Sequence, residues 1–135
     1  GRTGAAGIAN WVCPYDVDAH RAQALRHTAC IGAHPESFPD THGSPTMGMA
    51  YAALTAHLEP GAWRNLLDAN RWWFVLSECP DGTFYYQPNR DNAGYGGDSR
   101  LSASAVVAFI LTMEKRSLCI TGRDDTAIAP RTGPK

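Results

Sequence analysis

Residues 45–54 read PTMGMAYAAL, and this stretch decides the fold class. Pro45 suits the first position of a helix, because the amide hydrogen that proline lacks is not needed there. The residues that follow are small or apolar on nearly every side of a helix, which is typical of a helix that is buried all round. Glu59, Pro60 and Gly61 end it. The sequence therefore predicts a helix in the core of an all-α domain.

Further helices are predicted on both sides of this one along the chain. They cover residues 4–11, residues 17–31, one continuous helix from Gly61 through Phe74, and residues 103–114. Gly32 is predicted to lie just beyond the second of these helices, where glycine commonly ends a helix. After Gly61, apolar side chains recur with the helical period, so this helix is predicted to bury one face. Residues 103–114 are apolar on most faces and are predicted to be fully buried.

The sequence thus predicts one all-α domain of about five helices over residues 1–122 and a flexible tail over residues 123–135. Short extended segments are predicted near 83–87 and 117–121. A chain of 135 residues, with 44% hydrophobic and 19% charged residues, is long and apolar enough to bury a core.

Composition excludes several classes of partner. The formal net charge of -1 gives no global attraction to nucleic acid or to an anionic membrane. The longest apolar run, 105–111, is far shorter than the ~20 residues of a membrane span. No targeting segment is visible in the sequence, and the compartment stays open. Because the chain begins Gly1-Arg2-Thr3 without an initiator methionine, we expect it to be an excerpt of a longer protein.

Neither the cysteines nor the histidines predict a metal or a cofactor. Cys13, Cys30, Cys79 and Cys119 contain no C-x-x-C motif, and free thiols are favoured over disulfides without excluding them. His20 and His27 are two helical turns apart, which is too far for one metal ion. A loop could bring His34 and His42 together with Asp40, but packing or solvent exposure is favoured for these side chains.

The loop 88–100 is the best candidate for a functional site, because long polar loops between packed helices commonly hold such sites. An enzyme here would use Asp91 or His42 as general base and Tyr86 or Tyr95 as proton donor, with Arg90 neutralising a carboxylate. Of these residues, His42 and Tyr86 lie outside the loop. The substrate-binding candidates are Asn89, Asn92, Asp98, Arg100 and Trp72.

Two other interpretations of this loop stay open. Asp91 and Asp98 could form an acid–base pair, or could supply oxygen ligands for Ca²⁺ together with Asn89 and Asn92, although their order does not match the twelve-residue Ca²⁺ loop. The favoured interpretation is a structural turn whose carboxylates cap helices or pair with arginines. Trp72 and Trp73 are adjacent on a helix, so at most one of them is expected to face the core.

The stretch 41–111 resembles an uncharacterised bacterial domain family that is classed with the α/α-toroid proteins, which include terpenoid cyclases, protein prenyltransferases and squalene-cyclase-like repeats. The residues that carry the resemblance are His42-Gly43-Ser44 before a helix, Trp72-Trp73, Asp81-Gly82-Thr83-Phe84 and Pro88-Asn89-Arg90-Asp91. It extends over about 19–122. It implies alternating inner and outer helices with polar loops at the ends of a ring.

The resemblance does not imply cyclase or prenyltransferase chemistry. The only consecutive aspartates, Asp124-Asp125, lie in the tail, and no zinc-binding set matches. A closed toroid needs about twelve helices, which at about 11–12 residues per helix exceeds this chain. We therefore expect either flanking helical repeats or self-association.

Two classes of function follow from the sequence. The favoured one is a non-catalytic module, a fragment or an oligomerising unit, that serves binding or assembly. The alternative is an enzyme, a lyase or hydrolase, that acts on a polysaccharide or another polar polymer at the 88–100 loop. Its ligand would be a carbohydrate.

Overall fold

The structure is a computed structural model that describes residues 1–37, 45–85 and 99–122. Helices make up 77% of these residues, which contain no strand. They hold six α-helices: α1 (Arg2–Trp11), α2 (Val17–Ala33), α3 (Pro45–Ala56), α4 (Pro60–Ala69), α5 (Arg71–Ser77) and α6 (Ser99–Thr112). The all-α prediction is confirmed, with one helix more than expected. The packing gives no support to the α/α-toroid arrangement.

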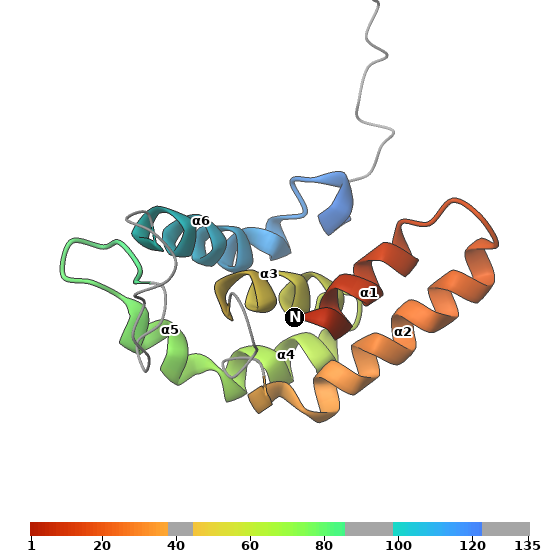
Figure 1. Ribbon diagram of the computed structural model, residues 1–135, viewed down its shortest axis with the longest axis horizontal. Helices are drawn as coiled ribbons and strands as arrows, with labels where there is room; N and C mark the ends of the chain where they lie inside the picture. The colour runs from red at the N-terminus through yellow and green to blue at the C-terminus, as the bar shows by residue number, and fades with distance from the viewer. Residues whose placement is uncertain (38–44, 86–98, 123–135) are drawn as a thin grey trace, which may run out of the picture.

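Helix α3 is the centre of the molecule, and α1, α2, α4 and α6 all pack against it (Figure 1). Its described residues are buried except for Met47 and Tyr51. Met49, Ala52, Ala53 and Leu54 belong to a core cluster that Ile31, Leu66 and Ile110 complete from the neighbouring helices. The prediction that this helix lies in the core is confirmed, but it is not buried all round, because Met47 and Tyr51 lie one turn apart on an exposed strip.

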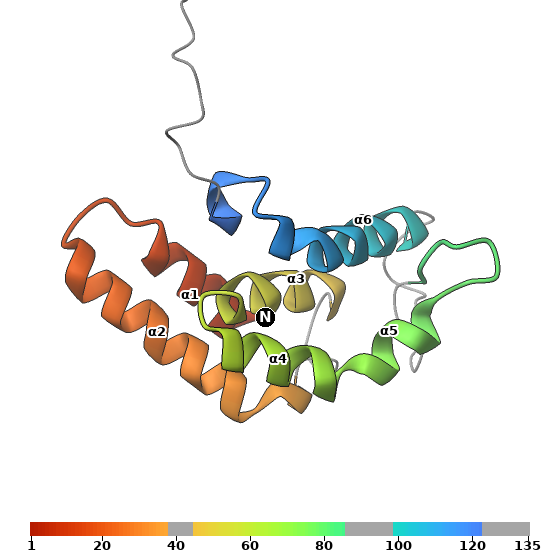
Figure 2. The ribbon, with the colours of Figure 1, turned by 180° about the vertical axis from the view of Figure 1, so that it is seen from behind.

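Helix α1 approaches α3 so closely that their backbones touch. A Cβ atom added to Gly4 would lie 2.5 Å from the backbone nitrogen of Ala52, and one added to Gly7 would collide with the side chain of Thr55. Small residues at these two positions of α1 therefore set the distance between the helices. The first turn of α1 lies beside α3 in both views (Figure 2).

Two buried threonines link three helices through hydrogen bonds. The Thr55 hydroxyl on α3 donates to the carbonyl oxygen of Gly4 on α1 over 2.7 Å. The Thr28 hydroxyl on α2 contacts the carbonyl oxygens of Ala24 and Thr55 at 3.1 and 3.0 Å. Both side chains are almost fully buried, so satisfying these polar groups fixes how α1, α2 and α3 fit together.

Gly32 does not end a helix as predicted. It lies within α2, which continues to Ala33, and a Cβ on Gly32 would come within 2.9 Å of the Cβ of Ala62 on α4. This position requires a small residue because α4 crosses α2 there. Asp16 precedes α2 in a left-handed conformation, and its side chain makes no capping hydrogen bond.

The predicted continuous helix after Gly61 is two helices, α4 and α5, which meet at Asn70. Asn70 is fully buried, and its amide donates to the carbonyl oxygen of Leu66 and to that of Pro35 in the single-turn helix η1 (Pro35–Ser37). The Glu59 side chain caps α4 by accepting from the amides of Gly61 and Ala62. The prediction was wrong because a tertiary contact to η1, remote in sequence, fixes the break.

The extended segments were also predicted wrongly in part. Near 83–87, Phe84 forms only an isolated antiparallel bridge with Glu78, and residues 86 and 87 lie outside the described ranges. Near 117–121 the chain forms a single-turn helix, η3 (Cys119–Thr121), after η2 (Met113–Lys115). The tail predicted for 123–135 also lies outside the described residues.

Helix α6 is not buried all round, although its sequence predicts this. Ala103, Val107 and Ile110 are fully buried against the core. The opposite side is open, with Leu101 67% and Leu111 61% exposed. Among the described α-helices, α6 packs mainly against α3, so it lies at an edge of the bundle (Figure 1).

Candidate functional site

Most of the residues predicted to form a site lie outside the described ranges. They are His42, Tyr86, Asn89, Arg90, Asp91, Asn92, Tyr95 and Asp98. Of the predicted set, the structure therefore places only Arg100 and Trp72. The acid–base, Ca²⁺ and structural interpretations of the 88–100 loop stay predictions.

Arg100 forms an ion pair in the first turn of α6. Its guanidinium lies 3.2 Å from the Asp81 carboxylate, and both side chains are more than half exposed. Asp81 also accepts from the amide and the hydroxyl of Thr83, which lowers the pKa of its carboxyl below the ordinary value. Gly82 completes this turn with a φ of 79°. The position of Arg100 is explained by this turn without any ligand.

Trp72 and Trp73 face different surroundings, as predicted. Trp73 is fully buried and meets Phe74 edge to face, while Trp72 is 42% exposed. Two buried polar atoms at this end of the molecule, Asn70 Oδ1 and Trp73 Nε1, have no hydrogen-bond partner among the described residues. Neither Trp72 nor Arg100 lines a cavity found among the described residues.

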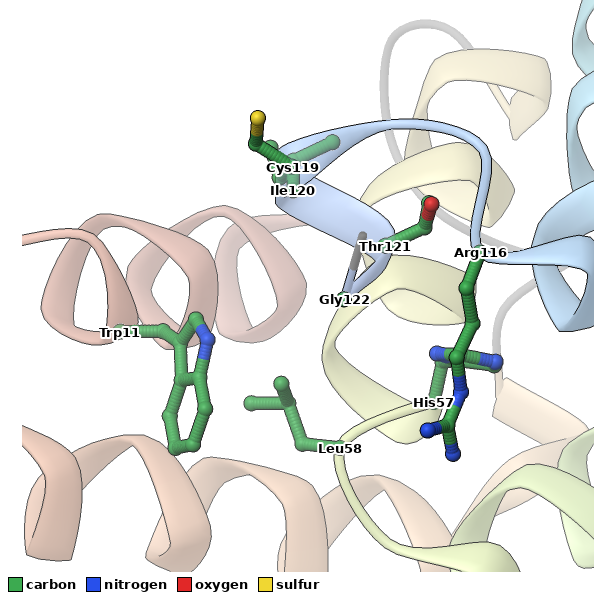
Figure 3. Close-up of a pocket in the computed structure, with 8 residues that line it drawn as sticks. All are labelled: Trp11, His57, Leu58, Arg116, Cys119, Ile120, Thr121 and Gly122. Atoms are coloured by element: carbon green, nitrogen blue, oxygen red, sulfur yellow. The ribbon is translucent and has the colours of Figure 1, made fainter. Parts of the chain in front are cut away.

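A cavity that the sequence did not predict lies at the other end of α6 (Figure 3). Its volume is about 170 Å³. The lining comes from the end of α1, the α3–α4 connection and the segment after η2, and consists of Trp11, His57, Leu58, Arg116, Cys119, Ile120, Thr121 and Gly122. Three segments that are far apart in sequence thus meet around one concave surface.

His57 and Arg116 are the polar groups that face this cavity. The hydroxyl of Thr121 also lines it, but bonds the backbone of Leu118. The sulfur of Cys119 points away in Figure 3. Partial burial, together with the positive charge of Arg116, lowers the pKa of His57, and the carboxylate of Glu114 opposes this effect. His57 is therefore predominantly neutral at pH 7.

A second cavity, of about 230 Å³, lies on the other side of the His57–Arg116 pair. Trp63 and Glu114 are among the residues that line it. The indole nitrogen of Trp63 donates to a Glu114 carboxylate oxygen over 2.9 Å, and the Trp63 ring meets His57 edge to face at 5.2 Å. These contacts hold the imidazole in place from one side and give the Glu114 carboxylate a hydrogen-bond donor.

The sequence analysis missed this region because its residues match no motif. His57 directly follows a helix that is buried on nearly every side. Such a position places a polar side chain at the edge of the core, and this was the available signal. Arg116 follows η2 with a left-handed φ of 48°, which nothing in the sequence indicates.

The described residues contain no group of three side chains that could hold a metal ion. His20 contacts Asn10, and His27 contacts Gln23. Two members of the predicted histidine cluster, Asp40 and His42, lie outside the described ranges. The thiols of Cys13, Cys30 and Cys79 are free but not fully buried.

No protein-family model matches this chain, and neither a curated protein nor a solved structure is significantly similar to it. Within residues 1–37, 45–85 and 99–122, no helix has the length and hydrophobicity needed to cross a membrane. The function is therefore argued from the described surface and cavities.

Proposed function

We propose that the chain is a helical assembly module that pairs with a second copy of itself through the outer face of α6. The observation that carries this proposal is the apolar character of that face. Leu101, Ala105, Ala108 and Leu111 are all exposed, and no charged residue occurs between Arg100 and Glu114. A helix that is apolar on both its inner and its outer sides is typical of one buried between two layers.

The order of these residues favours a second copy over an unrelated partner. The exposed apolar residues of the outer face are, in order, leucine, alanine, alanine and leucine, and the exposed polar residues Ser102 and Thr112 each follow one of the two leucines. The order of the apolar residues is therefore the same in both directions. In a twofold pair each patch contacts itself. Antiparallel α6 helices would place Leu101 against Leu111 of the partner subunit, and the small alanines would let the two backbones approach in the middle.

The size of the apolar surface sets the expected affinity. Complete burial of a leucine contributes about 1.5–3 kcal/mol, so the exposed parts of Leu101 and Leu111 are worth about 1–2 kcal/mol each. Four such leucines in a dimer contribute about 4–8 kcal/mol, against an association cost of about 4–15 kcal/mol. We therefore expect a weak, concentration-dependent dimer.

The pairing does not depend on the predicted toroid-like architecture, to which the packing gives no support. On α5, Val75 and Leu76 are 63% and 64% exposed, which leaves apolar surface for further contacts.

The test is the molar mass in solution, measured by sedimentation equilibrium over a wide range of concentration. We expect a reversible monomer–dimer equilibrium that Ala108→Arg shifts to the monomer, because the charged side chain cannot be buried in the apolar contact. Ala9→Arg is the matched control, since Ala9 is an exposed alanine on α1, and it should leave the equilibrium unchanged. A wild-type chain that stays monomeric at the highest concentrations refutes the proposal.

A charge exchange tests the antiparallel orientation. Leu101→Lys and Leu111→Glu should each weaken the dimer, and mixing the two variants should restore it through a new ion pair between the subunits. If wild type dimerises but mixing restores nothing, the two α6 helices do not pair in the proposed register.

A further inference from the structure

The cavity beside η3 contains two nitrogen donors that have no partner in the described chain. Among the described residues the imidazole of His57 makes no hydrogen bond, and its ring meets that of Trp63 edge to face. No carboxylate of the described residues lies within ion-pair distance of the Arg116 guanidinium, whereas the Arg100 guanidinium pairs with Asp81. Figure 3 shows the two side chains next to each other. Two adjacent donors without an acceptor between them favour an anion.

The cavity also has an apolar wall. Trp11 and Leu58 lie opposite the His57–Arg116 pair in Figure 3, and Ile120 also contributes to the lining. The guanidinium of Arg21 stacks on the Trp11 ring, with 5.3 Å between its carbon and the ring centroid, and so helps to fix the indole. An anion that also has an apolar group can therefore satisfy both sides of the cavity at once.

Size and charge narrow the class of ligand. A volume of about 170 Å³ is well below the roughly 300 Å³ at which pockets for drug-sized ligands begin. The carboxylate of Glu114 interacts with His57 from the neighbouring cavity, and it disfavours an ion that carries two or more negative charges. A single carboxylate fits these limits better than a phosphate dianion.

We propose that this cavity binds a small carboxylic acid with an apolar group, its carboxylate held by Arg116 and His57 and its apolar part packed on Trp11. The guanidinium donates two parallel hydrogen bonds or one shared bond to the carboxylate, and the imidazole donates another. This site lies at the opposite end of α6 from the Asp81–Arg100 turn and is independent of the proposed pairing of two copies.

The experiment is a titration of the full chain with benzoate, followed by NMR at the His57 imidazole and the Trp11 indole. We expect saturable shifts at both side chains and a rise in the pKa of His57, because a bound anion favours the charged imidazole. Acetate should bind more weakly, because it leaves the apolar wall uncovered. Phosphate at pH 8 tests whether charge alone is enough, and it should also bind more weakly.

Two arginine variants separate this site from general attraction of anions. Arg116→Gln should weaken benzoate binding by roughly 10- to 100-fold, since a hydrogen bond to a charged group contributes about 1.5–3 kcal/mol. Arg116→Lys keeps the charge but loses the planar fork, so an intermediate loss is expected. Arg26→Gln is the control, because Arg26 is exposed on α2, away from the cavity lining, and donates a hydrogen bond to Gln23.

Three results overturn the proposal: no saturable shift in the wild-type chain, equal affinity for benzoate and phosphate, or an unchanged affinity in Arg116→Gln. Thermal unfolding of each variant shows whether it is folded. If Arg116→Gln is unfolded, the comparison of Trp11→Leu with wild type decides instead. That variant should reduce the affinity for benzoate and leave the affinity for acetate almost unchanged.

Discussion

The substitution Gly4→Ala tests the close contact between α1 and α3 on which the fold depends. Alanine is better than glycine inside a helix by about 1 kcal/mol, so propensity alone predicts that this variant is more stable. The structure predicts the opposite. The new methyl group would lie 2.5 Å from backbone atoms of Tyr51 and Ala52, and a backbone cannot move aside as a flexible side chain can.

The expected loss can be estimated from three contributions. Overpacking at a rigid contact costs about 1–3 kcal/mol. Separation of the helices also weakens the 2.7 Å hydrogen bond from Thr55 to the Gly4 carbonyl oxygen, at about 1 kcal/mol. After subtracting the gain in propensity of about 1 kcal/mol, the net loss is about 1–3 kcal/mol. For a chain of this length that lowers Tm by roughly 4–12 °C.

The assay is thermal and urea unfolding followed by circular dichroism at the helical band. Ala9→Gly is the control, because Ala9 is exposed on the same helix and reports the propensity contribution alone. Gly7→Ala provides a contrast, since its obstacle is the side chain of Thr55 and a second change, Thr55→Ala, should relieve part of the strain. A Gly4→Ala variant that is as stable as wild type, or more stable, refutes the described contact.

Two further predictions concern His57 and Asn70. Because burial and then Arg116 lower the pKa of His57 below 6.5, the unfolded chain binds the proton more tightly than the folded chain does. The contribution of His57 to the free energy of unfolding should therefore be fully present above about pH 6.5 and should be lost as the pH falls through the lowered pKa. The variant His57→Gln should lack this part of the pH dependence. Asn70→Ala should lower the free energy of unfolding in urea by about 2–3 kcal/mol, because it removes two buried hydrogen bonds. One of these bonds holds η1 against the junction between α4 and α5. Asn65→Ala, which removes one exposed hydrogen bond, should cost much less, and equal effects of the two would contradict the role given to Asn70.

The sequence predicted burial correctly where the residues of a single segment determine it. Residues 45–54 are small or apolar at nearly every helical position, so their burial follows without knowledge of the rest of the chain. The contrast between Trp72 and Trp73 also follows from the 100° step between neighbours on a helix. In both cases the deciding information lies within a few residues.

The predictions failed where a distant segment decides the local structure. Gly32 has the composition of a helix end, but Ala62 from α4 requires a small residue there. Asn70 fits the period of one long helix, but the carbonyl oxygen of Pro35 bonds to it at a break. The cavity combines Trp11 with side chains more than forty residues away. No local pattern contains these contacts, and the 88–100 loop, which a local pattern did favour, lies mostly outside the described residues.

The failure at α6 differs from the others, and this difference supports the proposed pairing. For Gly32 and Asn70 the structure supplies a contact that explains why the prediction was wrong. For Leu101 and Leu111 it supplies none, since the outer face of α6 remains apolar and exposed among the described residues. The sequence of α6 is that of a helix buried on both sides, and a second copy on its outer face would bury it as its composition predicts. In that assembly the expectation of a buried helix would be correct for the dimer and wrong only for the isolated chain.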